Sequence, residues 1–307
     1  MFKNAIFYRL TEQLSTGLND TGAKLTESAL VPCNSQELSR IGFVPPHPDH
    51  EFMILESSGN WLITARKEKK ILPPKVIRKA LAERVKKIES EQARKVYRKE
   101  KLQLKDEIVL DMLPRAFSKF SDTRAIIMPK AGLIVVEAGS FSQAEELLNL
   151  LRNALGSLPV ALPSVNDSPS IVMSDMLSDP QKTGAEAGLF KSILLGCSCE
   201  LEDPVYGGGT IKIKNEYLLS DEVIAHIEAG KQVTSLAFEW RDSYRVMLHD
   251  DLRIKGIKMS YELSKEVNEE SSEDPIDRLR ADVFLHSAKL EKLWSDLAAV
   301  FGGEVER

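Results

Sequence analysis

Residues 51–66, EFMILESSGNWLITAR, hold two runs rich in apolar residues on either side of a Ser58-Gly59 pair. Such a pair suits the tight turn of a β-hairpin, so we expect one strand over 51–57 and another over 60–66. A similar pattern recurs at 123–137, where Lys130-Ala131-Gly132 separates two apolar runs. Because short turns join these strands, the sequence favours antiparallel sheets over parallel βαβ units.

The rest of the chain alternates further strands with helices, which makes the expected fold class α+β, with antiparallel sheets and hairpins beside long helices. The capping patterns include Ser142 with Glu145 before a leucine-rich helix, and Asp274 before Pro275. The connections from 157 to 209, which hold Gly184, Gly188 and Gly207-Gly208-Gly209, are expected to be irregular. We expect further strands over 4–9, 123–128, 133–137, 210–215, 232–240, 243–249 and 253–259. We expect helices over 21–30, 35–41, 75–105, 106–113, 142–156, 220–229 and 275–301.

The totals describe a chain with enough apolar residues for a sizeable core. It has 307 residues, 43% of them hydrophobic, and a formal net charge of −5. Its three cysteines, Cys33, Cys197 and Cys199, are too few for a disulfide framework, and no run is apolar and long enough for a membrane span. The N-terminus lacks the apolar core of a signal peptide. We therefore expect a soluble, cytoplasmic protein with no membrane partner.

Charge is distributed very unevenly along this acidic chain. Between Arg66 and Lys105 there are 16 Lys/Arg and 5 Asp/Glu, a net of +11 in 40 residues. Since the whole chain carries −5, the other 267 residues carry −16. Such polarity is typical of proteins that hold a polyanion on one surface.

Helical spacing sharpens this expectation. If one helix runs from 75 to 105, then Arg94, Arg98, Lys101 and Lys105 share a face. That face lies roughly opposite an apolar stripe made of Ile77, Leu81, Val85 and Ile88. A row of cations on an anchored helix suits the phosphates of duplex DNA and supplies affinity without sequence reading. Tyr97 is the only aromatic residue of the basic stretch, which disfavours base stacking with single strands.

Several segments then resemble the RdgC family of recombination-associated proteins, in the same order and over essentially the whole chain. The matching segments are Val31-Pro-Cys-Asn-Ser-Gln, Val44-Pro-Pro, Ala65-Arg-Lys-Glu-Lys-Lys-Ile-Leu-Pro, Glu91-Gln-Ala-Arg-Lys, Leu113-Pro-Arg-Ala-Phe-Ser-Lys-Phe-Ser, Leu155-Gly-Ser-Leu-Pro-Val and His226-Ile-Glu-Ala-Gly-Lys. The resemblance implies a nucleoid-associated, ring-shaped homodimer with a positively charged hole. It further implies binding of double-stranded DNA with little sequence preference, with single-stranded DNA as a second candidate ligand. Antagonism of RecA would then modulate recombination and replication-fork repair.

The resemblance also suggests roles for particular residues. It places Phe117, with Phe120 beside it, at a gate of the dimer, opposite the pair Lys214 and Asn215, although the preceding stretch departs from the family pattern. The expected DNA-binding residues are Arg66, Lys67, Arg94, Lys95, Arg98, Lys101, Lys105, Arg115, Lys119, Lys214 and Lys231. The chain is expected to form one RdgC-like unit over 1–307, with a core from 1–72 and 114–160, a basic helical region over 73–113 and a second α+β region over 161–307.

Other chemistry has weaker support in the sequence. Cys197-Ser-Cys199 lacks the second ligand pair of a structural zinc site, and the Gly207-Gly208-Gly209 run lacks the remaining residues of a phosphate loop. We expect no catalytic residue, cofactor or metal. One alternative is a metal-dependent nuclease that uses carboxylates such as Asp106, Glu107 and Asp111. Another is a structural protein whose basic helix binds an acidic partner, such as its own segment 262–274.

Overall fold

The computed structural model describes residues 2–14, 16–179, 193–205, 209–241, 243–261, 263–265 and 273–305, and within them it confirms the α+β class. The strands are β1 (Asn4–Leu10), β2 (Ser39–Val44), β3 (Ile54–Ser57), β4 (Asn60–Lys70), β5 (Ser118–Met128), β6 (Leu133–Val136), β7 (Val160–Ala161), β8 (Ile193–Glu202), β9 (Ile211–Lys214), β10 (Gln232–Trp240), β11 (Tyr244–His249) and β12 (Ile254–Met259). The helices are α1 (Leu18–Glu27), α2 (Pro74–Gln92), α3 (Arg98–Met112), α4 (Phe141–Leu155), α5 (Pro169–Ser178), α6 (Asp221–Glu228) and α8 (Pro275–Val300), with a 3₁₀ turn η1 (Leu113–Arg115).

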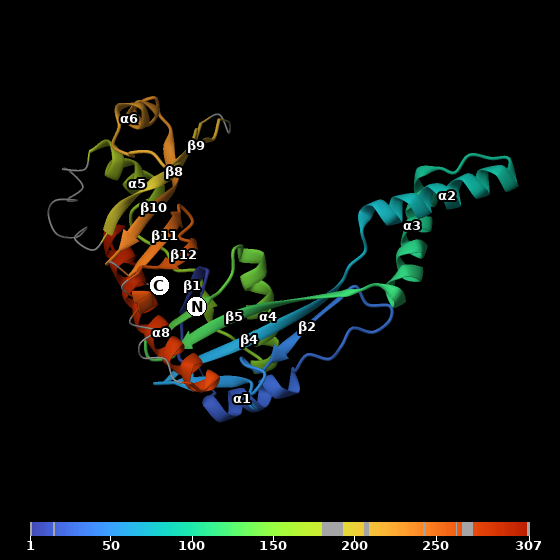
Figure 1. Ribbon diagram of the computed structural model, residues 1–307, viewed down its shortest axis with the longest axis horizontal. Helices are drawn as coiled ribbons and strands as arrows, with labels where there is room; N and C mark the ends of the chain where they lie inside the picture. The colour runs from blue at the N-terminus through green and yellow to red at the C-terminus, as the bar shows by residue number, and fades with distance from the viewer. Residues whose placement is uncertain are drawn as a thin grey trace.

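The strands form a sheet in the order β2-β4-β5-β6-β1-β12-β11-β10-β8-β9, with β3 paired to β4 and β7 to β1. β1 joins the two halves, since its first residues pair with β12 and the following ones with β6. All these pairs are antiparallel, and both expected hairpins are present. β4 and β5 pair over ten positions and extend as a long ribbon away from the rest of the sheet (Figure 1).

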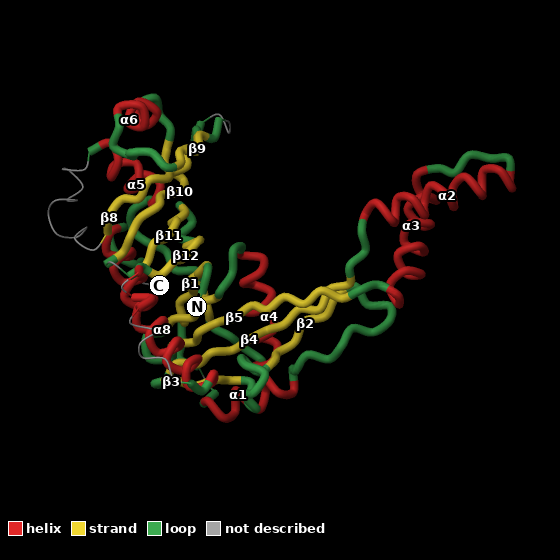
Figure 2. Tube along the Cα trace, in the orientation of Figure 1, coloured by secondary structure: helices red, strands yellow, loops and turns green. Residues whose placement is uncertain are grey.

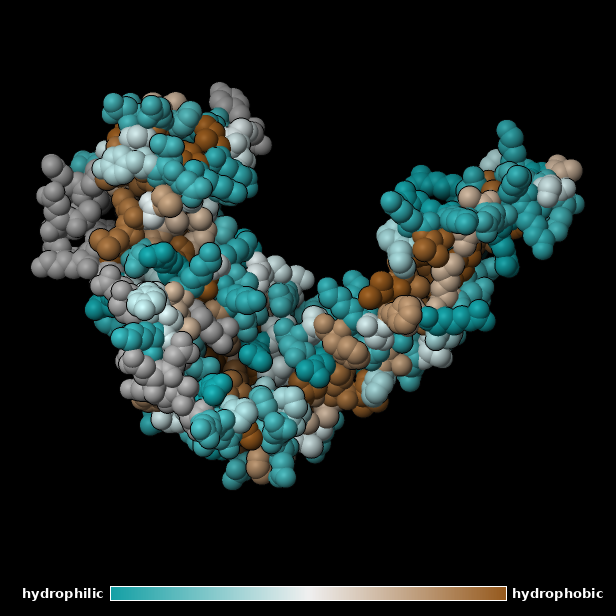
Figure 3. Space-filling model, in the orientation of Figure 1, coloured by the Kyte–Doolittle hydropathy of each residue, from teal (hydrophilic) through white to brown (hydrophobic). Residues whose placement is uncertain are grey.

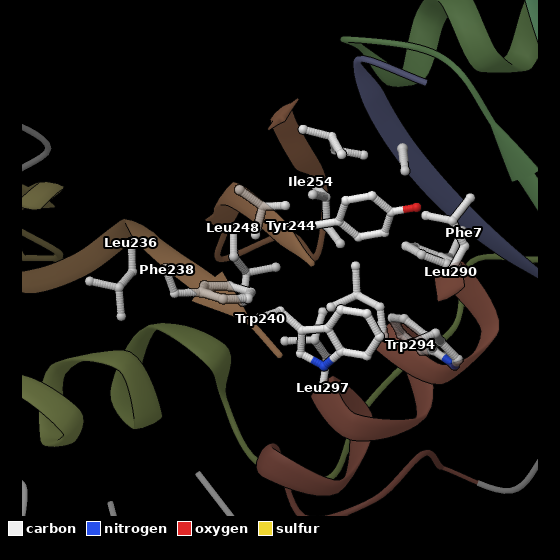
Figure 4. Close-up of a cluster of buried hydrophobic side chains, with 14 of the residues drawn as sticks. Phe7, Leu236, Phe238, Trp240, Tyr244, Leu248, Ile254, Leu290, Trp294 and Leu297 are labelled. Atoms are coloured by element: carbon white, nitrogen blue, oxygen red, sulfur yellow. The ribbon is translucent and has the colours of Figure 1, made fainter. Parts of the chain in front are cut away.

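Two hydrophobic clusters hold the sheet and its helices together. On one face, α1 and α4 cover β4, β5, β6 and β1, with Leu147, Leu148 and Leu151 of α4 fully buried. On the other face, α8 packs against the meander, as Figure 4 shows for Trp240, Trp294 and their neighbours. Phe7 of β1 stacks on Trp294 with ring centroids 5.1 Å apart. Alternating burial along β10 follows from the period of two in a strand, which sends every second side chain into the core.

The continuous helix predicted over 75–105 is wrong. α2 ends at Gln92, Ala93 adopts a left-handed conformation with φ of 47°, and α3 folds back alongside α2. The predicted apolar stripe of α2 explains this turn. Its residues are only half-buried, and a helix with one apolar stripe needs a partner to cover it. α3 supplies the buried Leu104 and Ile108, so the two helices form an arm at the end of the ribbon, outside both clusters (Figure 1).

Further predictions are wrong in detail. The helix expected at 35–41 is a turn that leads into β2, because pairing with β4 buries Phe43 and overrides local propensity. Gly42 permits this, since a Cβ there would lie 2.4 Å from the Cα of Leu30. α4 begins after Ser140, whose hydroxyl accepts from the backbone N–H of Gln143, two residues before the predicted Ser142 cap.

The region 157–209 is more regular than expected, because β7, α5 and the whole of β8 lie in it. Gly184, Gly188, Gly207 and Gly208 lie outside the described residues. Gly209 is described and has a φ of +82°. The strands of the meander, the helix 220–229 and the Asp274-capped last helix are confirmed, with ends within two residues of those predicted.

The described chain is bent into an open curve. The α2–α3 arm forms one side, and the end of the sheet with β8, β9 and α6 forms the other (Figures 1 and 2). The surface in between is largely hydrophilic in Figure 3, apart from an apolar patch where the ribbon meets the arm. The notch between the two sides is referred to below as the concave gap.

Candidate nucleic-acid interface

The β4–β5 ribbon sorts its charged residues between two faces. Lys67 lies on the face covered by α4, where its Nζ is 2.5 Å from a carboxylate oxygen of Glu146. Since side chains alternate along strands, Lys69 shares that face, and register places it opposite Lys119. Lys69 is not among the predicted DNA-binding residues, although the strand period of two places it on the same face as Lys67. Three lysines therefore gather on the α4 side of the ribbon.

Arg66 lies on the other face, although the sequence analysis grouped it with Lys67. Its guanidinium donates two hydrogen bonds to the carboxylate of Asp122, at 2.7 and 2.8 Å. Asp122 stands directly opposite Arg66 on β5. This bidentate pair raises the pKa of the Arg66 guanidinium, and two of its N–H donors are already hydrogen-bonded within the chain. The ribbon thus separates two residues that are adjacent in sequence.

α3 carries a row of accessible cations. Arg98, Lys101 and Lys105 follow i, i+3, i+7 spacing and are exposed. Within the described part of the chain, no carboxylate lies within ion-pair distance of any of the three, nor of Lys95 in the preceding turn. At ~1.5 Å per residue the row spans about 10 Å. These cations are available to an external anion, such as a backbone phosphate.

Arg94, the predicted fourth member of that row, has a different setting. It lies in the turn between the helices and donates to both carboxylate oxygens of Glu100, at 2.7 and 2.6 Å, and to the side chain of Gln92 at 2.7 Å. Hydrogen bonding to Glu100 raises the pKa of Arg94 and lowers that of Glu100. Arg94 therefore stabilises the turn between α2 and α3 through hydrogen bonds within the chain. Its contact with DNA remains a prediction.

The α2–α3 arm as a whole carries less net positive charge than residues 66–105, whose net charge is +11. From Pro74 to Met112 there are 12 Lys/Arg and 7 Asp/Glu, a net of +5. Asp106, Glu107 and Asp111 on α3 lower the charge toward the ribbon, and Glu107 lies 4.0 Å from Arg84 of α2. Positive charge is therefore concentrated toward the start of α3 and along the ribbon.

Two aromatic side chains stand exposed where the ribbon meets the arm. Phe117 is 84% exposed and Phe120 is 55% exposed. The backbone between them is held firmly: the carbonyl of Phe117 accepts from the N–H of Ile71 at 2.8 Å, and the Ser118 hydroxyl donates to the carboxylate of Glu68 at 2.5 Å. Glu68 is buried, also accepts from the backbone N–H of Cys33, and has a lowered pKa because of these hydrogen bonds. Apolar rings that are so exposed on an ordered backbone indicate an interface.

The second half of the predicted gate lies at the other side of the concave gap (Figure 1). Lys214 ends β9 opposite Ser198, and Asn215 follows with a φ of 56°; both are exposed. Lys231 donates to the carbonyl of Gly209 and is half-buried. Within the described chain, Lys214 and Asn215 therefore lie apart from Phe117 (Figure 1).

The described residues offer little for metal-assisted chemistry. Among them, no three His, Cys, Asp or Glu side chains are grouped so that they could hold a metal ion. Cys197 is exposed while Cys199 is buried, since the pairing of β8 with β10 is irregular there, and burial raises the pKa of Cys199 to about 11. Asp106, Glu107 and Asp111 are exposed on α3. Among the described helices, none combines the length and apolar character needed to cross a bilayer.

The fold and this surface define an α+β protein with a projecting, cationic two-helix arm. Comparison with known proteins gives the family. The family model described as "Putative exonuclease, RdgC" matches residues 1–304. The chain is 40% identical over 304 residues to the recombination-associated protein RdgC of Aeromonas hydrophila, covering 99% of this chain and 98% of the relative.

Other relatives carry the same name. The RdgC protein of Pseudomonas aeruginosa is 40% identical over 306 residues, with 99% and 97% coverage. That of Salmonella paratyphi B is 36% identical over 307 residues, with 100% and 99% coverage. The chain belongs to the RdgC family. The names of these relatives associate them with recombination, whereas the description of the family model names an exonuclease.

Proposed function

We propose that this protein binds double-stranded DNA with little sequence preference, as a ring-shaped homodimer that limits the access of RecA to DNA. The observation that carries the proposal is the row of exposed cations on α3, Arg98, Lys101 and Lys105, which have no carboxylate partner among the described residues. Positively charged side chains that project on an arm can approach the backbone phosphates of a duplex. They fix position without reading bases, which fits binding to unrelated sequences.

The dimer is supported by exposed apolar surface and by the bent shape of the chain. β5, which holds Phe120 and directly follows Phe117, reaches the arm on one side of the concave gap, and β9, which ends at Lys214, lies on the other side (Figure 1). Two bent chains joined at both ends would enclose a hole. The arm and the α4 face of the ribbon, with Lys67, Lys69 and Lys119, would then supply cations to its lining. Such a ring would hold duplex DNA through topology as well as through charge.

In this proposal, the protein antagonises RecA by occupying the DNA that RecA would bind. A protein that covers the phosphate backbone denies the same DNA to other proteins, and no covalent step is needed. The recombination-associated names of the relatives support a role in this process. Modulation of recombination and replication-fork repair, and association with the nucleoid, belong to the same proposal.

The decisive experiment combines binding with a test for cleavage. Purified protein is titrated with duplexes of unrelated sequence at several salt concentrations, and with supercoiled plasmid in Mg²⁺. We expect similar affinities for all duplexes, a steep loss of affinity with salt, and intact plasmid. Nicking that an Asp106→Asn, Glu107→Gln double variant abolishes would replace the proposal with a nuclease. No affinity at low salt would favour binding of an acidic protein by the arm.

A further inference from the structure

β3 has one edge that no other strand covers. It is joined to β4 by a two-residue turn, in which Ser58 and Gly59 both have positive φ (53° and 86°), and Ser57 pairs with Asn60. In such a hairpin, Leu55 exchanges hydrogen bonds with β4, while the N–H and C=O groups of Ile54 and Glu56 point away from it. Within the described residues β3 pairs only with β4, so these groups form an open edge.

This edge forms part of a groove of about 770 Å³ between two helices. One wall is α1, which contributes Leu18, Gly22 and Thr26, and Arg280 of α8 lies at the opposite side. Gly22 borders open space in the groove, because a Cβ on it would meet only the Cδ1 of Ile54, at 3.9 Å. Figure 2 shows β3 close to α1 and to the start of α8, on the side of the sheet away from the concave gap.

A large apolar side chain borders the groove and is held in place. Phe52 is 70% exposed, its carbonyl lies 2.9 Å from the Nδ1 of the buried His50, and the two rings make an edge contact at 5.9 Å. Natural sheets usually protect open edges with very short strands, charged residues, proline or a covering segment. β3, Ile-Leu-Glu-Ser, is short and carries one charged residue, but it has no lysine or proline and no described strand covers its outer edge. An open edge beside an ordered, exposed phenylalanine indicates a docking surface.

The two ends of the groove carry opposite charges. Glu51 is exposed at the end where β3 begins, and Arg280 lies beside Ser57 at the end where β3 stops. Arg280 is 3.2 Å from Asp277, but both side chains are more than half exposed, so this pair is weak and can be exchanged for another carboxylate. The carboxylate of Glu56 is already used, since it accepts from the N–H of Gly59 at 2.6 Å.

We propose that this groove binds an extended segment of a partner protein, which adds to β3 as a further strand and places a carboxylate next to Arg280. The outward N–H and C=O groups of Ile54 and Glu56 lie ~6.8 Å apart along the edge, the repeat of two residues in a strand, so only an extended backbone can satisfy both. A second copy of β3 fits poorly, because the groove at each edge is lined by α1 on one side and by Arg280 of α8 on the other. The proposal is independent of DNA binding, since the groove lies away from the arm.

The test uses two fluorescein-labelled heptapeptides with opposite charge order, Lys-Ser-Val-Thr-Val-Ser-Glu and Glu-Ser-Val-Thr-Val-Ser-Lys. Fluorescence polarisation with the full chain should show saturable binding of at least one of them. Gly22→Leu, which fills the groove and improves helix propensity, should weaken that binding tenfold or more without lowering the melting temperature. Gly17→Ala, at the start of α1 with open space around it, is the matched control and should leave binding unchanged. Arg280→Gln should weaken it severalfold.

Amide hydrogen exchange gives a readout that is specific for strand addition. The bound peptide should protect the amides of Ile54 and Glu56 and leave that of Leu55, which is already bonded to β4, unchanged. No saturable binding of either peptide, or binding that Gly22→Leu does not affect, would overturn the proposal. A change of oligomeric mass in Gly22→Leu would overturn it in favour of a second copy. The DNA affinity of Gly22→Leu should equal that of wild type. Failure of peptide binding and failure of DNA binding can therefore be told apart.

Discussion

Neutralising the row on α3 should remove the electrostatic part of DNA binding that this row supplies. The perturbation is the triple variant Arg98→Gln, Lys101→Gln and Lys105→Gln. All three side chains are exposed, and no carboxylate of the described chain pairs with them, so the free energy of folding should change little. The helix should also persist, because glutamine has a helix propensity close to those of arginine and lysine.

The magnitude follows from counterion release. Each phosphate contact contributes about 0.9 to the slope of log K against log salt, so three contacts contribute about 2.7 per arm. Raising the salt fourfold, from roughly 50 to 200 mM, then weakens wild type by about 40-fold more than the variant. The ratio of the wild-type DNA affinity to that of the variant should therefore fall by that factor over this salt range. The fall should be the same for duplexes of unrelated sequence.

The assay is fluorescence anisotropy with two unrelated 30-base-pair duplexes across that salt range. The control is Arg280→Gln, Lys289→Gln and Lys292→Gln on α8, which changes the net charge equally on a helix away from the arm (Figure 1). An unchanged slope in the α3 variant, an equal loss in the α8 control, or a loss limited to one duplex would refute the assignment of phosphate contacts to α3.

Three further predictions address the dimer, the core and the loading of DNA. Phe117→Ala should weaken the dimer tenfold or more in sedimentation, as expected for a buried aromatic at an interface, with the melting temperature unchanged since this ring is 84% exposed in the single chain; Phe52→Ala is the control, and equal dissociation constants would rule out the gate. Burial lowers the pKa of His286 to about 4, so the unfolded chain binds more protons between about pH 6.5 and 4, and stability should fall by about 3 kcal/mol as the pH drops through that window. His286→Leu should flatten this dependence in urea titrations, and an unaltered pH profile would contradict the assignment. Linear DNA should load faster than closed circles in filter-binding time courses if the ring seldom opens; equal rates would argue against encirclement.

Much of the antiparallel sheet could be predicted because its signals are local. The Ser58-Gly59 turn, the apolar runs that flank Lys130-Ala131-Gly132, and the three strands of the meander all depend on neighbours in sequence. Asp274 caps α8 through hydrogen bonds to the residues directly after it, which is again a short-range effect. The strands of the meander and α8 lie within two residues of the predicted bounds, whereas β4 runs four residues past its predicted end at 66 and β5 begins five residues before its predicted start at 123.

The candidate site was only partly predictable, because its geometry depends on contacts between distant residues. The excess of cations from 66 to 105 is a property of the sequence, and so is the spacing of Arg98, Lys101 and Lys105. The separation of Arg66 from Lys67, however, depends on the pairing of β4 with β5, which also joins Arg66 to Asp122. Glu68 was missed as well, because its partners Cys33 and Ser118 are 35 and 50 residues away.

The sequence by itself determined the α+β class, the hairpins, and the concentration of positive charge in one segment, because turn residues, strand alternation and charge counts act over a few positions. Only the tertiary structure decided that this segment is a folded-back pair of helices. A half-apolar α2 is stabilised by burying its stripe against Leu104 and Ile108, and no local propensity encodes that partner. The same packing placed Arg94 in a turn with Glu100 and left the α3 cations exposed.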